Sequence, residues 1–352
     1  MEFIIHKNKN LLLKTAVVIL NFNGEKFLKQ FLPSVVSSVA HREDVRVFVV
    51  DNASTDQSKT ILLEEFPNVE TIFFDKNYGF AEGYNKAIKQ IEAKYVVLLN
   101  SDVQVDSDWL LPLEKCLDKQ LDIAACQPKI LAFHDVKSFE YAGAAGGFID
   151  KYGYPFCRGR LFSKTEIDEG QYDDEIDCFW ATGACLFIRR EDYLLTGGLD
   201  AEFFAHMEEI DLCWRLRSRG KRIVCVPNSK VYHVGGGTLA VSNPRKTYLN
   251  FRNNLFLLYK NLPEKDLKKK IFLRKVLDGI AAVQFLLKGE WGNVKAVFRA
   301  HQDFDKNYLS FKEKRLENMS KVTQSNIAEI YQRSIVFDFF LKGKRVFSQL
   351  NF

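Results

Sequence analysis

The first 130 residues alternate short β-rich runs with segments of helical periodicity. Five runs are rich in Val, Ile, Leu and Phe: TAVVILN (15–21), VRVFVVDN (45–52), VETIFF (69–74), YVVLLN (95–100) and IAACQPKI (123–130). This alternation is typical of βαβ units, in which a parallel sheet is buried on both faces. The sequence therefore predicts an α/β domain built on a mostly parallel central sheet.

Polar residues stand where four of these strands are expected to end. They are Asn21 and Asn23, Asp51, Asn77, and Asn100 with Asp102. The carboxyl ends of parallel strands lie at one edge of a sheet, and ligands bind at that edge in open α/β folds. Asn and Asp also favour ordinary turns, but four successive strand ends indicate a binding edge.

The remainder of the chain is organised differently. Residues 131–200 are irregular, Gly-rich and aromatic, which is typical of a segment that covers or lines a site, or of a surface excursion. Strands are expected within 178–191 and at 222–227, with an acidic helix between them. From residue 246 onward the pattern predicts amphipathic helices with Lys and Arg on their polar faces.

The charge of the chain is unevenly distributed. The net charge is +5, but residues 1–245 hold 29 Lys and Arg against 35 Asp and Glu, whereas residues 246–352 hold 21 against 10. A basic region of this kind suits an anionic membrane surface or nucleic acid, although a solvated helical face is the commoner explanation.

Cysteine usage and hydropathy indicate the compartment. The seven cysteines include no C-x-x-C pair and lie mostly in apolar runs, which predicts reduced, buried thiols in a cytoplasmic protein and no structural zinc. The N-terminus lacks the layout of a signal peptide. The longest apolar runs fall well short of the roughly 20 residues that cross a bilayer, so no transmembrane helix is expected.

One acidic stretch needs an explanation. FFAHMEEIDLCWRL (203–216) places Glu208, Glu209 and Asp211 among large apolar side chains. Acids are favoured in the first turn of a helix by roughly 0.3–1 kcal/mol each, and Asp211 has Arg215 four residues on. Glu209 has no such partner, since the residues three and four positions on are Leu and Cys. This exception leaves a catalytic acid as the alternative.

Several familiar sites are excluded. NFNGEK, after the first strand, has one glycine, so the dinucleotide fingerprint is missing; the phosphate-binding P-loop and the G-x-S-x-G nucleophile elbow are missing too. Three other residues suggest chemistry. Asp51 offers an acceptor for an imide N–H, and Asp102 stands where a divalent cation bridging a diphosphate would sit. His233 adds an imidazole, followed by Gly235–Gly237, whose N–H groups suit phosphate. Each also has an ordinary interpretation, as a helix cap, a core histidine or a turn.

Seven ordered segments together resemble a known family. They are VVILNFNG, VFVVDNASTD, NYGFAEGYNKAI, YVVLLNSD, TGACLFIRRE, GGLDAEFFAHMEEIDLCWRLRSRG and VPNSKVYHVGGGT. The set is similar to the family 2 glycosyltransferases, in particular their bacterial rhamnosyltransferase-like branch, and spans about residues 14–245. FRNNLFLLYKNLP, at the start of the C-terminal region, is also similar to that branch.

The resemblance implies a GT-A fold, in which a Rossmann-like nucleotide-binding half and an acceptor-binding half share one sheet. The implied organisation is an N-terminal extension (1–13), a GT-A domain (14–245) and a basic helical region (246–352). Within the GT-A domain, residues 14–130 would bind the nucleotide sugar and residues 131–245 the acceptor.

The resemblance also implies roles for individual residues. Those implied for the nucleotide sugar are Asn21, Asn23, Asp51, Ser54, Asn77, Gly79, Asn85, Asn100 and Gly183. Asp102 would be the metal-binding acid of an Asp-x-Asp element that reads Asn100-Ser101-Asp102 here, and His233 a second ligand of Mg²⁺ or Mn²⁺. The family's Glu-Asp-x-Asp motif reads Glu208-Glu209-Ile210-Asp211, so Glu209 would be the catalytic base. Trp180 would stack on the acceptor sugar, with a core tryptophan as the alternative.

The implied function is an inverting transfer from a nucleoside diphosphate sugar, with dTDP-rhamnose as one candidate, to a saccharide or lipid-linked saccharide in cell-surface polysaccharide synthesis. The protein would be cytoplasmic, or peripheral on the inner face of an anionic cell membrane, and would bind no nucleic acid. Two alternatives are a nucleotidyltransferase, which would normally carry a Gly-rich basic loop after the first strand, and a non-catalytic sugar- or nucleic-acid-binding protein.

Overall fold

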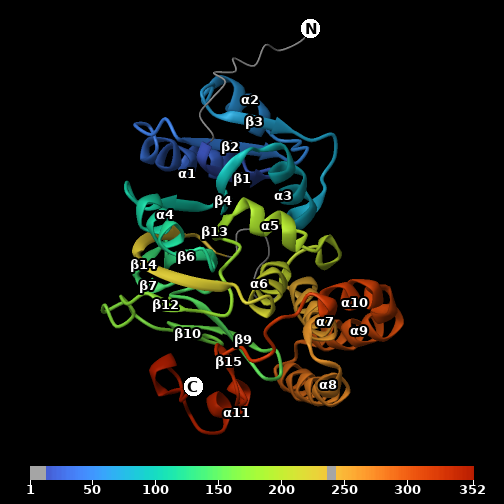
Figure 1. Ribbon diagram of the computed structural model, residues 1–352. Coiled ribbons are helices and arrows are strands. Elements are labelled where there is room, and N and C mark those ends of the chain that lie inside the picture. Colours follow the sequence, from blue (N-terminus) through green and yellow to red (C-terminus); the bar gives the residue numbers. More distant parts are fainter. Residues whose placement is uncertain (1–12, 236–242) are drawn as a thin grey trace.

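The computed structural model describes residues 13–235 and 243–352. Its largest element is a ten-stranded sheet of order β12-β14-β6-β13-β4-β1-β2-β3, in which β5 also pairs with β14 and β7 with β6 (Figure 1). The strands are β1 (Leu13–Asn21), β2 (Val45–Asp51), β3 (Glu70–Phe73), β4 (Ala93–Asn100), β5 (Val103–Val105), β6 (Ile123–Ala132), β7 (Asp135–Phe139), β12 (Ile176–Asp177), β13 (Cys185–Arg189) and β14 (Arg222–His233). All five runs predicted as strands are strands.

The strand directions confirm a mostly parallel sheet. β1 pairs in parallel with β2 and β4, and β2 with β3. β13 lies between β4 and β6 and is antiparallel to both. β6 therefore runs in the same direction as β4 and β1, and so does β14, which pairs in parallel with β6. Asn21 is opposite Asp51, and Leu20 is opposite Asn100. The polar strand ends therefore meet at one edge.

Both faces of the sheet are covered by helices. Val17 and Val18, neighbours in β1, belong to two different core clusters, because successive side chains of a strand point to opposite faces. Leu28 packs in the cluster of Val17, and Tyr84 in the cluster of Val18. The helices of this part are α1 (Glu25–Ser38), α2 (Ser58–Glu64), α3 (Gly79–Gln90), α4 (Leu110–Lys119), α5 (Arg190–Thr196) and α6 (Glu208–Ser218).

The segment expected to be irregular builds a second, five-stranded sheet of order β11-β10-β9-β8-β15. Four of its strands are β8 (Gly147–Asp150), β9 (Pro155–Cys157), β10 (Arg160–Leu161) and β11 (Lys164–Thr165). The fifth, β15 (Ile330–Tyr331), comes from the C-terminal region and pairs in parallel with β8. The C-terminal region thus supplies a strand as well as the helices that its pattern predicted.

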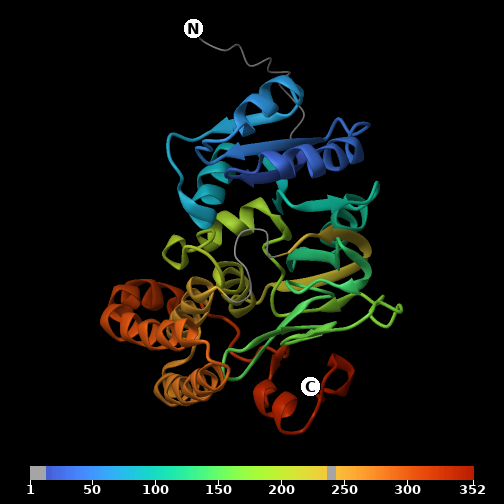
Figure 2. The ribbon, with the colours of Figure 1, turned by 180° about the vertical axis from the view of Figure 1, so that it is seen from behind.

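Four C-terminal helices form a group beside α6 (Figures 1 and 2): α7 (Pro244–Asn261), α8 (Glu264–Leu287), α9 (Trp291–Asn307) and α10 (Lys312–Ser320). The last helix, α11 (Ile335–Phe340), lies apart from this group, near the C-terminus and below β15 in Figure 1. Within the described ranges no helix is both long and apolar enough to cross a membrane. All seven cysteines are free and buried, which matches the prediction of reduced, buried thiols.

Candidate active site

The ends of β1 and β2 carry a connected polar cluster. Asn21 Nδ2 donates to Asp51 Oδ1 (3.0 Å) and to Ser54 Oγ (3.2 Å), and the backbone N–H of Ser54 donates to Asp51 Oδ2 (3.0 Å). The backbone N–H of Asn23 donates to Ser54 Oγ (2.9 Å). Asn21 and Asp51 are buried. Four residues that the resemblance assigns to the nucleoside are therefore brought together at the predicted edge.

A second polar cluster lies between β3 and α3. Asn77 Oδ1 accepts hydrogen bonds from the backbone N–H of Gly79 (2.8 Å) and from Asn52 Nδ2 (2.9 Å). Gly79 has a φ of +75°, a left-handed conformation in which glycine is favoured. A Cβ on Gly79 would lie 3.8 Å from the Phe204 ring. The loop that precedes α6 therefore lies against the predicted nucleotide edge.

Asn85 has a different environment from the other residues in this set. Its Nδ2 donates to the carbonyl oxygen of Leu199 (2.7 Å), and its Oδ1 accepts from the hydroxyl of Tyr193 (2.7 Å) and the N–H of Leu199 (3.0 Å). These contacts tie α3 to the turn after α5. Its assignment to the nucleotide pocket stays a prediction.

Asp102 and His233 are brought together by the antiparallel pairing of β5 with β14. His233 Nε2 lies 3.2 Å from Asp102 Oδ1 and 3.5 Å from Asn100 Nδ2, and both Asp102 and His233 are buried. On the other side of the ring, Nδ1 lies 3.3 Å from Oε2 of Glu140, a buried carboxylate that the sequence analysis did not single out. Burial opposes protonation of His233, but hydrogen bonds and charge from the two acids raise its pKa to about 10.

Glu208 and Glu209 begin α6, and no cation in the described part of the chain forms an ion pair with either carboxyl group. Oε2 of each is buried and accepts no hydrogen bond from the residues that the structure describes. Burial, followed by the charge of Glu209, raises the pKa of Glu208 well above its ordinary value, whereas burial raises the pKa of Glu209 to about 7. Burial therefore favours the protonated form of both carboxyl groups.

Glu209 is connected to the predicted metal side through the loop before β13. A Cβ on Gly183 would lie 3.9 Å from Glu209 Cβ, so this glycine faces the acid. The next residue, Ala184, accepts a hydrogen bond at its carbonyl oxygen from the N–H of Asn100 (3.0 Å). Asn100 in turn lies beside His233. Gly183 therefore stands between the acidic motif and the end of β4.

The loop before α6 is strained and is held by the C-terminal region. Phe204, His206 and Met207 all have positive φ (+66°, +70° and +75°), a conformation that costs energy in residues with a Cβ and is typical of functional sites. Asn253 Nδ2 of α7 donates to the carbonyl oxygens of Phe203, Ala205 and His206, each at 2.8 Å. The strain is thus stabilised by a buried side chain that the sequence pattern did not reveal.

His206 adds a third buried polar atom without a partner. Its Nε2 accepts or donates no hydrogen bond among the described residues. Burial, with the charge of Lys246, lowers its pKa to about 4, so the ring is neutral at neutral pH. Unpartnered buried polar atoms are uncommon in native proteins. Three of them within residues 206–209 indicate that a polar ligand completes this site.

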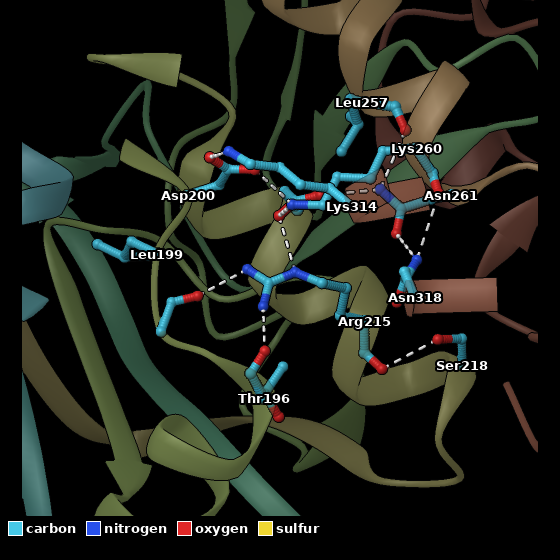
Figure 3. Close-up of polar contacts among 12 residues, drawn as sticks. Thr196, Leu199, Asp200, Arg215, Ser218, Leu257, Lys260, Asn261, Lys314 and Asn318 are labelled. Carbon is cyan, nitrogen blue, oxygen red and sulfur yellow. Dashed lines mark hydrogen bonds and ion pairs between the residues drawn. The ribbon is translucent and has the colours of Figure 1, made fainter. Parts of the chain in front are cut away.

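Asp211 differs from the other two acids because it pairs with two cations, Arg215 and Lys260, which Figure 3 shows in one polar cluster with Asp200 and Asn261. Its Oδ2 lies 2.8 Å from both Arg215 Nε and Lys260 Nζ, and its Oδ1 accepts from Asn261 Nδ2 (2.9 Å). Burial opposes its ionisation, but Arg215 and Lys260 hold its pKa below the ordinary value. Lys260 also pairs with Asp200 (2.7 Å). We therefore expect Asp211 to anchor α6 to α7 rather than to take a proton.

Two further assignments are constrained by the structure. Trp180 is 4% exposed, packs against Gly147 and donates its Nε1–H to the carbonyl oxygen of Phe148 (2.9 Å); this is the core position that the sequence left as the alternative to sugar stacking. Of the three glycines after His233, Gly235 is described, with a φ of +69°. Gly236 and Gly237 lie outside the described residues.

Comparisons with known proteins place the chain in a class. It is 28% identical to N-acetylglucosaminyl-diphospho-decaprenol L-rhamnosyltransferase of Mycobacterium tuberculosis, over 62% of this chain and 75% of that protein. It is 25% identical to rhamnosyltransferase WbbL of Escherichia coli K12, over 62% of this chain and 82% of that protein. A crystal structure of GalNAc-T7 with UDP, GalNAc and Mn²⁺ covers 72% of this chain and 48% of that one, with 16% identity and a TM-score of 0.54.

The fold is the GT-A fold predicted from the sequence, and the class that it defines with these relatives is the glycosyltransferases. The model of glycosyl transferase family 2 matches residues 16–193, half of the chain. The chain belongs to glycosyl transferase family 2. Family membership and the two relatives support glycosyltransferase activity, the function that the sequence favoured over a nucleotidyltransferase or a non-catalytic binding protein.

Proposed function

We propose that the protein is an inverting glycosyltransferase that transfers a sugar from a nucleoside diphosphate sugar to a saccharide in cell-surface polysaccharide synthesis, with Glu209 as the catalytic base. The observation that carries this proposal is the cluster of buried polar atoms in His206, Glu208 and Glu209 that have no hydrogen-bond partner within residues 13–235 and 243–352. It lies beside Gly183, next to the sheet edge where the nucleotide-binding candidates converge.

The chemistry requires one ionised carboxylate near neutral pH. An acceptor hydroxyl becomes a nucleophile when a base within hydrogen-bond distance takes its proton, and a base works best when its pKa is close to the working pH. The pKa of Glu209, raised to about 7 by burial, meets this condition. Attack then comes from the face of the sugar opposite the diphosphate, so a single base is sufficient and the anomeric configuration inverts.

The residues present fit a divalent cation. Among the described residues no three His, Cys, Asp or Glu side chains form a complete metal site, so the diphosphate of the donor would complete the coordination. Adjacent ligands of an octahedral ion at about 2.1 Å are about 3 Å apart, and Asp102 Oδ1 and His233 Nε2 are 3.2 Å apart. Asp102 and His233 would hold Mg²⁺ or Mn²⁺, with the ring of His233 releasing the proton of Nε2 as the ion binds. The ion when bound neutralises charge on the leaving diphosphate.

Glu140 would position the metal-binding face of His233. A metal-bound histidine usually gives its other ring N–H to a carboxylate, which fixes the ring and its tautomer. Glu140 Oε2 is 3.3 Å from His233 Nδ1.

We expect Glu140→Gln to weaken Mn²⁺ binding by about 10- to 100-fold, measured by calorimetry with Mn²⁺ and the nucleoside diphosphate. Glu114→Gln is the matched control, because Glu114 is also buried but bonds to Thr15 and Arg42. Equal Mn²⁺ affinity in both variants would contradict the role of Glu140.

The relatives supply the candidate substrates. Two of them are named as rhamnosyltransferases, and one as acting on N-acetylglucosaminyl-diphospho-decaprenol. By analogy we propose dTDP-rhamnose as the first donor to test and a lipid-linked saccharide as the acceptor. The enzyme would then work at the inner face of the cell membrane, where an acceptor of that kind is carried.

The proposal is tested with a panel of dTDP-, UDP- and GDP-sugars and a short-chain diphospholipid-linked N-acetylglucosamine acceptor, with Mn²⁺ or Mg²⁺ present. We expect nucleoside diphosphate release that depends on one donor and on the acceptor. Absence of release with every donor and with both metals would contradict the proposed function.

A further inference from the structure

Helix α8 carries an exposed apolar stripe. Phe272, Val276, Ile280, Val283 and Leu287 follow one another at intervals of four, four, three and four residues, which places them on one face of the helix. Their exposed fractions are 66%, 46%, 60%, 54% and 83%. Monomeric proteins rarely leave a continuous apolar surface of this length, about 22 Å, in contact with water.

The same face of α8 begins with lysines. Lys265, Lys268 and Lys269 are exposed and lie three or four residues apart from one another or from Phe272, so they continue the stripe toward the start of the helix. No ion pair in the described part of the chain involves these three lysines. The outward face of α8 therefore consists of a basic end followed by about four apolar helical turns. Helices that lie in a membrane interface have this composition.

The turn after α8 extends the apolar surface. Leu286 is 41% exposed, and Trp291, which opens α9 after the turn at Gly289, is 63% exposed. Tryptophan favours the boundary between lipid tails and headgroups, because its ring is apolar and its N–H is polar. The tip of the α8–α9 hairpin thus ends in the residue type that anchors proteins at that boundary.

A groove between α8 and α11 adjoins the stripe. Its apolar lining consists of Leu273, Val276 and Leu277 from α8 with Phe337 from α11, and its charged lining of Lys151, Arg333, Lys342 and Asp338. Val276 belongs to both the groove and the stripe. Asp338 pairs with Lys342, so the lining keeps a net positive charge, and an apolar groove with a positive charge matches the chemistry of a lipid with an anionic headgroup. Figures 1 and 2 show α8 and α11 at the end of the molecule opposite β3.

We propose that this face, here called the α8 face and made of the stripe, the three lysines and the α8–α11 groove, docks on an anionic lipid bilayer. Charge decides between a bilayer and a second copy of the chain. Residues 246–352 hold 21 Lys and Arg against 10 Asp and Glu, so two copies would bring like charges together, whereas anionic headgroups are complementary. The inference rests on the proposed function in one respect, since a lipid-linked acceptor would lie in the same bilayer.

The test is flotation of the full-length protein with vesicles that contain no acceptor, so that its outcome does not depend on activity. We expect binding to phosphatidylcholine vesicles with about 30% phosphatidylglycerol, weak binding to phosphatidylcholine alone, and loss of binding at high salt. The double variant Ile280→Glu/Leu287→Glu should weaken binding by at least about tenfold. Replacing the three lysines with Gln should weaken it roughly fivefold per lysine.

The matched control is Leu121→Glu/Leu309→Glu. Leu121 is 80% exposed, close to the 83% of Leu287, and Leu309 is 61% exposed, close to the 60% of Ile280. Leu121 and Leu309 lie outside the α8 face. Control binding equal to wild type, with all variants keeping nucleoside diphosphate release on a water-soluble acceptor, supports the proposal. Equal binding of test and control variants would overturn it. A second result would also overturn it: the wild type is a dimer in light scattering and does not bind vesicles, and the Ile280→Glu/Leu287→Glu variant is a monomer.

Discussion

Replacing Glu209 with Gln is expected to lower kcat by about 10²- to 10⁴-fold, the range that a general base contributes. The amide keeps the size and polarity of the side chain but cannot take the proton of the acceptor hydroxyl. KM for the donor should change little, because the residues proposed to bind the nucleotide lie on other elements. The measurement is steady-state nucleoside diphosphate release with donor and acceptor both saturating.

The same substitution has a predictable pH signature. The pKa of Glu209 is about 7, so kcat/KM of the wild type should rise with pH through about 7 and then level off, and Glu209→Gln should lack this rise. Stability changes in the opposite direction. An acid whose pKa is raised by folding binds more protons in the folded state, so wild-type stability falls as pH increases from the unfolded pKa to about 7. The Gln variant should escape this loss and equal or exceed the wild type in thermal unfolding at pH 8.

Glu208→Gln is the control for the assignment of the base. Its carboxyl group is the neighbour of that of Glu209, and its Oε2 is likewise buried without a hydrogen-bond partner among the described residues. Burial and the charge of Glu209 raise its pKa well above the ordinary value and so favour its protonated form, which an amide should replace with less than a tenfold loss of kcat. If Glu208→Gln removes activity and Glu209→Gln retains it, the base has been assigned to the wrong acid.

Replacing Asp211 with Ala is expected to reduce the free energy of unfolding by about 3–5 kcal/mol, the cost of removing one partner from a buried ion pair. Asp211 is fully buried and contacts Arg215, Lys260 and Asn261. Without it, two buried cations lose an anion, although Asp200 still pairs with Lys260. Denaturant unfolding followed by circular dichroism measures the change.

Glu317→Ala is the matched control for Asp211→Ala. Glu317 also pairs with a cation four residues on, Lys321, but the side chain of Glu317 is 68% exposed. Exposed pairs contribute about 0–1 kcal/mol, so this variant should unfold close to the wild type. Equal destabilisation by the two substitutions would contradict the view that the Asp211 cluster joins α6 to the C-terminal helices.

The sheet and its binding edge were predictable because their signals are local. A parallel strand buried on both faces is an unbroken apolar run, and polar residues at its carboxyl end mark the edge. For the same reason the sequence alone was sufficient to place Asn21 and Asp51 together. Asp211 was likewise matched with Arg215, because the two are one helical turn apart.

The contacts that hold the acidic motif were not predictable because they join distant parts of the chain. Asn253 lies in FRNNLFLLYKNLP, a segment that resembles the family but assigns no contact to this residue, and its amide holds the strained loop before α6. Glu140 lies in the segment expected to be irregular, and only the folding of that segment brings it to His233. β15 consists of two residues, too few for a periodic pattern, and it becomes a strand by pairing with β8.

The central claim, inverting transfer from a nucleoside diphosphate sugar, is tested most directly by the product of the donor panel. Proton NMR of that product gives the anomeric configuration of the new linkage, which can be compared with that of the donor. The account predicts nucleoside diphosphate release with one donor and a linkage of the opposite configuration. A linkage that retains the configuration of the donor, or no release from any donor, would contradict it.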